Sequence, residues 1–364
     1  MLRQVPNIRF IGRGPFKEFV DVRLGSAEIL LKRIMDAVVG NKGTLIVLDS
    51  WDSMAKEMDV VERLKIERSI VAIVEANESA VVFVSEEPSL TTTDYLADAI
   101  VTLKDETYKG MRLRIVEWDK LRGCPIPKKR FVFTLNEGRF SMLLGFEGSK
   151  ECTFTRVHLP EAIDGLDVIL FEIGLGVYSK GIEPLIHALM SEFLLKGHSV
   201  VTIPIGMETP KKMLERIKRL GVQGRLSVGG FYHYEKEDIF YLDPTSPERI
   251  VDTLIEEGDK LGGLCLYIIG CDVLEYFFGK EGLVRLIFKL SRRIREKEAS
   301  LILLIGQDSE SLKELANMSD AHMKFQMVEQ ALVVYAIKPQ GGSLYHVGYA
   351  YDEGIPKVEI IPIR

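Results

Sequence analysis

The clearest chemical potential in this chain lies in the eight residues Gly-Leu-Gly-Val-Tyr-Ser-Lys-Gly at 174–181, between an apolar run and a helix-period segment. A phosphate-binding loop requires Gly-x-x-x-x-Gly-Lys-Ser/Thr there: glycines let backbone N–H groups face the phosphates, Lys reaches the outer oxygens, and the hydroxyl holds magnesium. Lys180 fits, but Ser179 replaces a glycine and Gly181 replaces the hydroxyl residue. The alternative is a strand–turn–helix connection without a nucleotide. The candidate nucleotide-binding residues are Gly174, Gly176, Ser179 and Lys180.

Two acidic residues are the candidate catalytic groups. Asp49 ends the apolar run 45–48, where nucleotide hydrolases place the Asp that holds the water shell of the metal. The matching residues later in the chain, Gly270 and Cys271, are not acidic. Glu208 is the carboxylate of the segment 205–210 that could orient an attacking water. The alternatives are a carboxylate that caps a turn for Asp49, and a helix N-terminal residue for Glu208.

Lys120 and Arg122 are two residues apart on a predicted strand, so both side chains point to the same face. Two cations aimed in one direction suit a phosphate or an acidic partner. The alternative is a solvated basic edge that also contains Lys128, Lys129 and Arg130. No His or Cys residues have the spacing of a metal site, so no metal ligands are predicted.

Apolar runs alternate with helix-period segments along the chain, which predicts an α/β fold with a mainly parallel sheet flanked by helices. The runs lack polar alternation, which is typical of strands buried on both faces. The predicted strands are residues 44–48, 80–85, 167–173, 199–205, 264–269 and 300–305. The predicted helices are residues 182–196, 210–220, 247–260 and 272–297.

An internal repeat organises the chain. Four blocks recur in the same order at an offset of about 220 residues: 26–43 with 246–263, 45–48 with 266–269, 80–84 with 300–304, and 97–101 with 319–323. This predicts two domains, residues 1–149 and 150–364. The front of the second copy has no counterpart in the first. A first copy without this part would leave an exposed sheet edge or an apolar face that needs cover.

Composition excludes several classes of protein. The 364 residues are 46% hydrophobic and 27% charged, which supports a sizeable core. A net charge of −6 argues against broad attraction to nucleic acid. No apolar run is long enough to span a membrane, and the N-terminus lacks the apolar region of a signal peptide. Four cysteines without a C-x-x-C pair predict reduced thiols and a cytoplasmic protein, and the scarcity of Asn and Gln is typical of thermophiles.

These residues resemble a known family. Asp49, the segment 97–101, Lys120-Leu121-Arg122-Gly123 and the segment 130–138 look like the latter part of a KaiC-type domain, from the RecA superfamily of ATPases. Residues 154–364 resemble a whole but degenerate domain of that type. The resemblance implies two RecA-like (P-loop NTPase type) domains, of which the first is incomplete.

The resemblance also implies roles for individual residues. Asp49 matches the Walker B acid, and Lys180 matches the P-loop Lys. Lys120 and Arg122 match a pair that reaches the γ-phosphate held by a neighbouring subunit of a ring. The paired catalytic glutamates of the family fall on Met207 and Glu208, so the first is missing.

Losses at linked positions predict a degenerate ATPase that acts as a regulatory or interaction module. ATP and magnesium remain possible cofactors by resemblance, as does a homo-oligomer (a ring or dimer) with an unidentified protein partner. One alternative is an active ATPase whose P-loop lies upstream of this start. Another is a RadA-like DNA-binding protein, against which the net charge of −6 counts. We expect no nucleic-acid or membrane partner.

Overall fold

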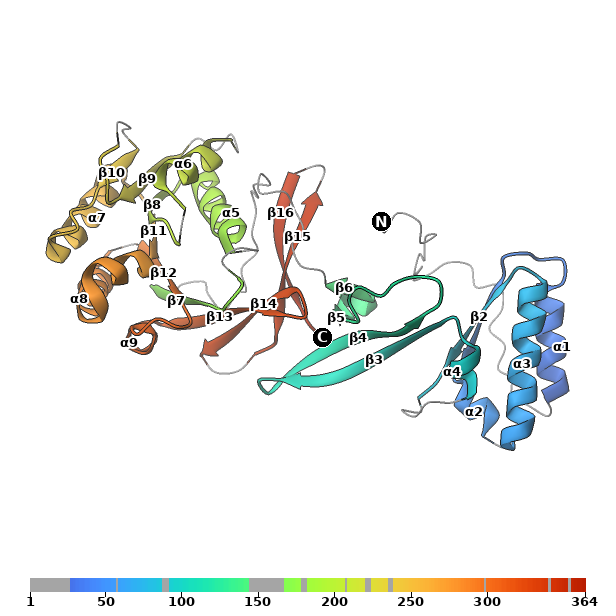
Figure 1. Ribbon diagram of the computed structural model, residues 1–364. Coiled ribbons are helices and arrows are strands. Elements are labelled where there is room, and N and C mark those ends of the chain that lie inside the picture. The colour runs from blue at the N-terminus through green and yellow to red at the C-terminus, as the bar shows by residue number, and fades with distance from the viewer. Residues whose placement is uncertain are drawn as a thin grey trace. The chain divides into compact units, whose positions relative to one another are not determined.

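The computed structural model describes eleven stretches of the chain, and Figure 1 shows them as ribbons. They are residues 27–56, 58–86, 92–143, 167–177, 182–206, 208–219, 224–234, 238–297, 299–339, 342–352 and 355–364. The chain divides into two compact units. The first is residues 1–102 with 118–129, and the second is residues 103–117 with 130–364. The predicted domain boundary near residue 150 lies outside the described residues.

The first unit contains a two-stranded parallel sheet with helices on one face. Its elements are α1 (Ala27–Val38), β1 (Leu45–Asp49), α2 (Trp51–Ala55), α3 (Val60–Ala76), β2 (Ala80–Val84) and α4 (Thr92–Leu96). Figure 1 shows α1 and α3 on the same side of β2. The spacing of Leu30, Ile34 and Val38 places them on one side of α1, where they are buried. Asp59 begins α3, because its carboxylate accepts the N–H groups of the first turn.

Two long strands, β3 (Ala99–Tyr108) and β4 (Met111–Leu121), begin a four-stranded sheet that β5 (Arg130–Thr134) and β6 (Ser141–Leu143) complete. A short 3-10 turn, Asn136–Gly138, joins the last two. In the second unit this sheet packs on the end of a larger sheet through Ile115 and Val132, which lie in one core cluster with Val333 and Tyr335. Residues 103–117 of β3 and β4, together with β5 and β6, therefore belong to the second unit, whereas the outer ends of β3 and β4 belong to the first.

The second unit is built on a ten-stranded sheet of order β10-β9-β8-β11-β12-β7-β13-β14-β15-β16. The strands from β10 to β13 pair in parallel, and the last three pairs are antiparallel. The strands are β7 (Val168–Ile173), β8 (Ser199–Ile203), β9 (Arg225–Gly230), β10 (Ile239–Tyr241), β11 (Cys265–Gly270), β12 (Ala299–Gly306), β13 (Ala321–Val328), β14 (Ala331–Lys338), β15 (Tyr345–Asp352) and β16 (Ile355–Pro362).

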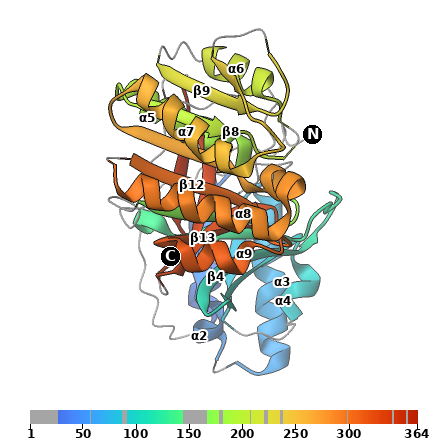
Figure 2. The ribbon, with the colours of Figure 1, turned by 90° about the vertical axis from the view of Figure 1, so that its left-hand side faces the viewer.

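Helices cover both faces of the parallel part. One face packs on α5 (Ile182–Leu195) and α6 (Pro210–Arg219). The other packs on α7 (Pro247–Leu261), α8 (Cys271–Arg295) and α9 (Leu312–Met318). Figure 2 shows α7 and α8 in front of the strands of this sheet. The predicted α/β class with parallel strands is confirmed, and the predicted elements of the second unit end within about two residues of the observed ones.

One prediction about the strands is wrong for β1 and β2. These apolar runs were expected to be buried on both faces, but Leu45, Val47 and Val82 are exposed. Among the described residues, helices cover only the opposite face of this small sheet, so alternate side chains remain uncovered. The exposed apolar face that was predicted for a shortened first copy is therefore present.

The order of elements recurs along the chain. We call α1 to β6 the first set and α7 to β16 the second set. In chain order, each set has a helix, a strand, a helical segment, a strand, a short helix and four consecutive strands. The helical segment is α2 and α3 in the first set and the single long helix α8 in the second. The pairing register recurs as well, because Leu45 pairs with Ala80 and Leu266 pairs with Ser300. These are the residues that the sequence blocks align.

No helix in the described part of the chain has both the length and the apolar character needed to cross a membrane.

Candidate functional site

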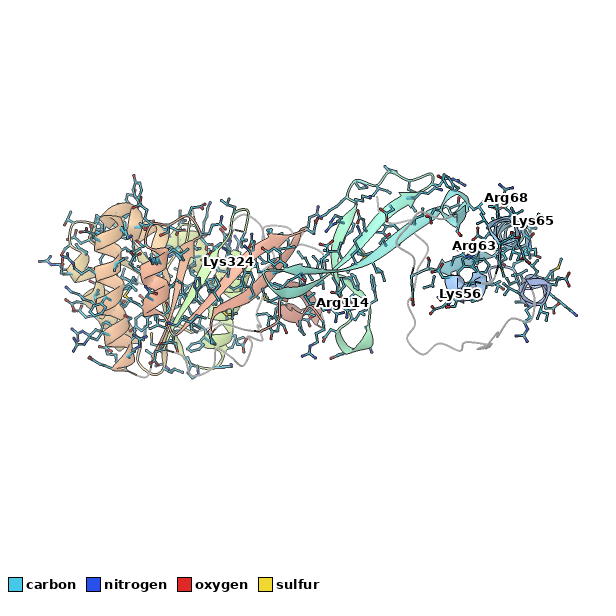
Figure 3. The ribbon with its side chains drawn as sticks, turned by 90° about the horizontal axis from the view of Figure 1, so that it is seen from below. Lys56, Arg63, Lys65, Arg68, Arg114 and Lys324 are labelled. Carbon is cyan, nitrogen blue, oxygen red and sulfur yellow. The ribbon has the colours of Figure 1, made fainter. Side chains whose placement is uncertain are left out.

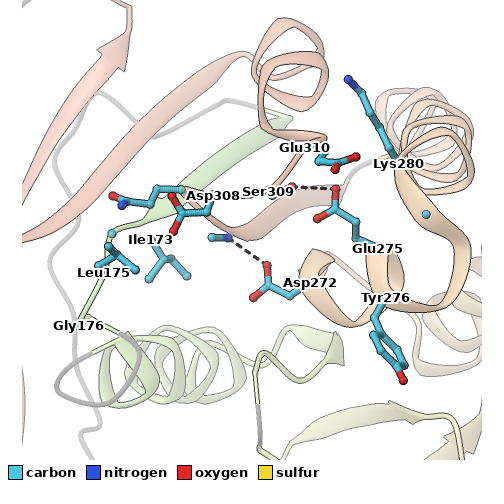
Figure 4. A pocket seen from close by; sticks show the side chains of 14 residues that line it. Ile173, Leu175, Gly176, Asp272, Glu275, Tyr276, Lys280, Asp308, Ser309 and Glu310 are labelled. Carbon is cyan, nitrogen blue, oxygen red and sulfur yellow. Dashed lines mark hydrogen bonds between the residues drawn. The ribbon is translucent and has the colours of Figure 1, made fainter.

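A cavity of about 620 Å³ opens at the carboxyl ends of β7, β11 and β12 (Figure 4). Ligands of open α/β sheets bind at this edge, because loops from neighbouring parallel strands meet there. It is also where the turn after β7 begins, so the predicted nucleotide site and the cavity coincide in part. The cavity is lined by Ile173, Gly174, Leu175, Gly176, Asp272, Glu275, Tyr276, Gly279, Lys280, Gly306, Gln307, Asp308, Ser309 and Glu310.

The turn after β7 depends on two glycines. A Cβ atom at Gly174 would lie 2.9 Å from the carbonyl oxygen of Phe325, and the Gly174 N–H donates to that same oxygen at 2.8 Å. Gly176 has a φ of 78°, which disfavours any side chain. The strand–turn–helix that the sequence predicts is confirmed, since α5 begins at Ile182. Ser179 and Lys180 lie outside the described residues.

Steric crowding explains why no acidic residue ends β11. Gly270 corresponds to Asp49 in the aligned blocks, and a Cβ atom at position 270 would lie 2.4 Å from the carbonyl oxygen of Pro204. Real Cβ atoms essentially never approach backbone that closely. An Asp at this position would require β11 and the end of β8 to move apart. The position aligned with Asp49 is therefore filled by close backbone packing.

Asp272 holds a loop. Its Oδ1 accepts the N–H of Gly306 at 3.0 Å, which ties the start of α8 to the end of β12. Asp52 does the same in the first set, where its Oδ2 accepts the N–H of Glu86 at 2.6 Å. The two carboxylates thus have equivalent positions and partners, and both position backbone.

The other carboxylates of the cavity leave it negatively charged. Glu275 Oε1 accepts the Ser309 hydroxyl at 2.9 Å and also binds Ser311. Lys280 is the one cation among the lining residues, and it pairs with Glu314 at 2.9 Å. Asp308 and Glu310 add two more carboxylates to the lining. The described lining therefore carries four carboxylates and one cation.

Glu208 lies in a buried cluster away from the cavity lining. Its Oε1 accepts from Arg216 Nη1 at 2.8 Å, and its Oε2 lies 3.2 Å from His187 Nε2. Arg216 also binds Glu183 at 2.9 Å, so the cluster ties α5 to α6. A carboxylate held by two partners positions helices and is not free to orient a water. Met207, beside it, lies outside the described residues.

Asp49 ends β1, as predicted, and its side chain is exposed. Its carboxylate makes no hydrogen bond or ion pair with any residue that the structure describes. The turn-capping alternative therefore has no support in the described contacts. Asp49 is sterically available to a ligand, unlike its counterpart Gly270.

Lys120 and Arg122 have different roles. Lys120 Nζ donates to the carbonyl oxygens of Asp94, at 2.9 Å, and Tyr95, which are at the end of α4. Lys338, its aligned counterpart, donates to the carbonyl of Ser319 at the end of α9. Both lysines therefore satisfy carbonyl groups at the C-terminus of a short helix. Arg122 is 60% exposed and pairs with the exposed Asp98.

The basic edge of β5 is compensated by acidic neighbours. Lys129 pairs with Asp119 at 2.8 Å, and Arg130 pairs with Glu106 and Glu329. Sequence reasoning did not single out four further basic side chains, one directly after α2 and three on α3, which Figure 3 labels. They are Lys56, Arg63, Lys65 and Arg68.

Arg63 of this group is already paired with the buried Glu67. The basic character of α2 and α3 is therefore partly neutralised.

Sequence reasoning also missed a buried ionic cluster in the large sheet. Glu172 on β7 lies 2.9 Å from His322 Nε2 and also binds Lys324, both on β13. Burial raises the pKa of Glu172, but the hydrogen bonds and charges of His322 and Lys324 outweigh it and hold the pKa below its usual value. A Glu inside an otherwise apolar strand was the signal that could have found it. The cluster fixes the register of β7 on β13.

No group of three or more His, Cys, Asp or Glu residues in the described stretches could hold a metal ion. Ser179 and Lys180, the predicted loop residues nearest the cavity lining, lie outside those stretches. No protein-family model matches the chain, and no curated protein matches it significantly.

Proposed function

We propose that this chain is a KaiC-like protein of the RecA superfamily whose second domain no longer hydrolyses nucleotide and which acts by binding other proteins. The observation that supports this best is the packing at Gly270. A side chain there would begin with a Cβ atom 2.4 Å from backbone, which leaves no room for a metal-binding acid. Loss of a side chain could be reversed by a single substitution. Loss of the space for it could not.

The other candidate groups support the same proposal. Asp272 and Glu275 hold loops, and Glu208 is held by Arg216 and His187. Phosphoryl transfer depends on a metal-bound triphosphate surrounded by positioned charges. In this chain Asp272, Glu275 and Glu208 are engaged with protein groups, and the described lining of the cavity is acidic.

Packing in this fold rests on different residues from catalysis, so a domain can keep its shape and its surfaces after chemistry is lost. Both faces of the ten-stranded sheet keep dense apolar cores. This combination favours an interaction protein with a regulatory role, and the exposed Arg122 is a group that a homo-oligomer or a protein partner could use.

The test is magnesium-dependent ATP turnover and the thermal shift caused by ATP with magnesium, measured on the full chain. We expect neither above background. The variant Lys180→Ala should change neither the turnover nor the thermal shift. The matched control Lys196→Ala, directly after the end of α5, should also leave both unchanged. Turnover that Lys180→Ala abolishes and Lys196→Ala retains would overturn the proposal.

A second candidate function is ATP hydrolysis at the first set, with a phosphate-binding loop supplied from outside the described residues. The observation that favours it is the exposed carboxylate of Asp49 at the end of β1. Turnover that is lost in Asp49→Asn but unaffected by Lys180→Ala would identify this function.

A further inference from the structure

Aromatic side chains gather where β9 and β11 end, and several of them are exposed. Tyr276, near the start of α8, is 85% exposed, and Tyr232, shortly after β9, is 73% exposed. The ring centroid of Phe277 lies 5.4 Å from that of Tyr276 and 4.3 Å from that of Phe231. We call Phe231, Tyr232, Tyr276 and Phe277 the aromatic surface. Exposed aromatic side chains in contact with one another are typical of binding surfaces.

The aromatic surface is continuous with the cavity at the carboxyl ends of β7, β11 and β12, because Tyr276 also lines that cavity. Figure 4 shows Tyr276 and the exposed Leu175 on opposite sides of it. A volume of about 620 Å³ is ample for one long side chain of a bound polypeptide. Such a side chain would have an aromatic ring on one side and an aliphatic group on the other.

Two carboxylates of the cavity lining are available to a ligand. Asp308 and Glu310, in the loop after β12, are exposed, and their carboxylates make no hydrogen bond or ion pair with any residue that the structure describes. The other two acids of the lining are bonded to protein groups. Lys280, the cation of the described lining, pairs with Glu314 at 2.9 Å. The charges that remain for a ligand on the described lining are therefore negative.

An arginine side chain has the chemistry that suits both features. Its planar guanidinium group stacks on aromatic faces and donates parallel hydrogen bonds to carboxylates. A lysine ammonium group supplies a point charge without the planar stack. Single-stranded nucleic acid also stacks on aromatic rings, but its phosphates would lie beside the carboxylates of Asp308 and Glu310, which is unfavourable. Charge complementarity therefore selects a basic polypeptide from the ligands that an aromatic surface could bind.

We propose that the aromatic surface and the adjoining cavity form a docking site for an arginine-containing segment of a partner protein. One arginine side chain enters the cavity, stacks on Tyr276 and pairs with the carboxylates of Asp308 and Glu310. The residues that flank this arginine lie on Phe277 and Tyr232. The proposal gives the chemistry of the partner and so rests on the proposed function as an interaction protein. The site lies entirely within the second unit.

The probe is the fluorescein-labelled peptide Arg-Gly-Arg-Gly-Arg-Gly, mixed with the full chain and followed by fluorescence anisotropy. We expect saturable binding. Replacing every arginine of the peptide by citrulline should weaken binding by about tenfold or more, because citrulline keeps the shape of arginine and carries no charge. A lysine version should bind about threefold more weakly than the arginine peptide, because it loses the planar stack.

The aromatic contribution is tested with Tyr276→Ala, which should weaken binding of the arginine peptide by about tenfold, because it removes the stacking partner. Tyr95→Ala is the matched control, since Tyr95 is a 78% exposed tyrosine on α4. The control chain should bind the peptide as tightly as the parent.

The charge contribution is tested in a chain that carries both Asp308→Asn and Glu310→Gln, which should also weaken binding by about tenfold. The matched control carries Asp36→Asn and Glu75→Gln, which remove the same charge from exposed positions of α1 and α3. This control shows whether the peptide recognises the cavity or only the net negative charge of the chain.

Four results would overturn the proposal. They are the absence of saturable binding, equal binding of the arginine and citrulline peptides, equal binding by the cavity variants and their controls with unchanged circular dichroism, and self-association that Tyr276→Ala abolishes. In the last case a second copy occupies the aromatic surface. ATP turnover is measured on the same preparation. Absent peptide binding without turnover would refute this proposal alone, whereas turnover that Lys180→Ala abolishes would refute the proposed function.

Discussion

The two sets of elements bury their aligned apolar strands to different extents. In the second set, Ile268 lies in the middle of the sheet under α5, and strands flank β11 on both sides. In the first set, the aligned Val47 is on a two-stranded sheet with one uncovered face. The amino acids at these positions are equally apolar. The comparison shows that burial is decided by which neighbouring elements are present, and that an apolar strand alone does not establish it.

The two sets also differ at the place where chemistry would occur. Asp49 ends β1 with an exposed carboxylate, whereas Gly270 ends β11 against the backbone of Pro204. The first set keeps an acid without a described loop beside it. The second unit keeps the strand–turn–helix of β7 and α5, but β11 in the second set ends in Gly270 and not in an acid. Neither half is complete by itself, which is the physical basis of the proposed loss of hydrolysis.

The largest expected effect comes from placing a charge on the same face in both sets. Ile268→Lys should destabilise the chain by about 4 kcal/mol or more, because it buries an unpaired ammonium group. Val47→Lys should change the free energy of unfolding by only about 0.5 kcal/mol, because its side chain stays in water. Urea unfolding of both variants measures this difference. Equal changes in the free energy of unfolding would show that the apolar face of β1 and β2 that carries Leu45, Val47 and Val82 is covered in the free protein.

The next effect concerns the ends of the aligned strands. Gly270→Ala should lower the free energy of unfolding by about 3 kcal/mol, because even a methyl group at this position would clash with the carbonyl oxygen of Pro204. Asp49→Ala should cost less than about 0.5 kcal/mol, since its carboxylate is exposed. Thermal melts of both variants check the contrast. A Gly270→Ala chain as stable as the parent would mean that the acid could return easily.

A third effect tests the buried ionic cluster, which has no aligned equivalent among the described residues of the first set. Glu172→Gln should cost about 2 kcal/mol at neutral pH, because it removes the charge that His322 and Lys324 face. The pKa of Glu172 is lowered on folding, so its stabilising effect is fully present above the usual pKa of 4.5. The effect is lost as the pH falls through the lowered value.

The measurement for this third effect is the difference in unfolding free energy between parent and Glu172→Gln as a function of pH. The difference should be constant from neutral pH down to about pH 5 and should shrink below pH 4.5. A difference that grows on acidification would contradict the assignment.

The smallest effect concerns the two lysines that contact the ends of short helices. Lys120→Met and Lys338→Met should each cost about 1 kcal/mol, because each leaves helix C-terminal carbonyl groups without a cationic donor. Arg122→Ala should cost less than about 0.5 kcal/mol, since its partner Asp98 is equally exposed. Chemical denaturation of the three variants ranks them. A cost for Lys120→Met far from that of Lys338→Met would break the equivalence of the two sites.

Much of the fold could be predicted because its strands are continuous apolar runs and its helices have clear ends. The apolar run 167–173 predicts β7, which spans Val168–Ile173, and α5 begins at the predicted Ile182. The exposure of Val47 could not be predicted from its own strand, because it depends on a helix and a strand that lie elsewhere in the sequence.

The candidate site was harder to predict than the fold. A carboxylate such as Glu208 has the same residue type whether it orients a water or holds Arg216, and only the three-dimensional contacts distinguish these roles. The constraint at Gly270 comes from Pro204, more than sixty residues earlier, which sequence spacing does not reveal. Lys120 was assigned to a phosphate by resemblance, whereas its described contacts are helix carbonyl groups.

The most direct test of the account is hydrogen–deuterium exchange of the full chain, followed by mass spectrometry with and without ATP and magnesium. We predict that amides of Leu45–Asp49 and Ala80–Val84 exchange much faster than those of Cys265–Gly270 and Ala299–Gly306, because the small sheet has two strands in the described part of the chain and exposes Leu45, Val47 and Val82. We also predict that ATP with magnesium leaves the amides of residues 174–177 and 270–272 unchanged. Equal protection of the two strand pairs, or slower exchange at those residues on adding ATP, would contradict it.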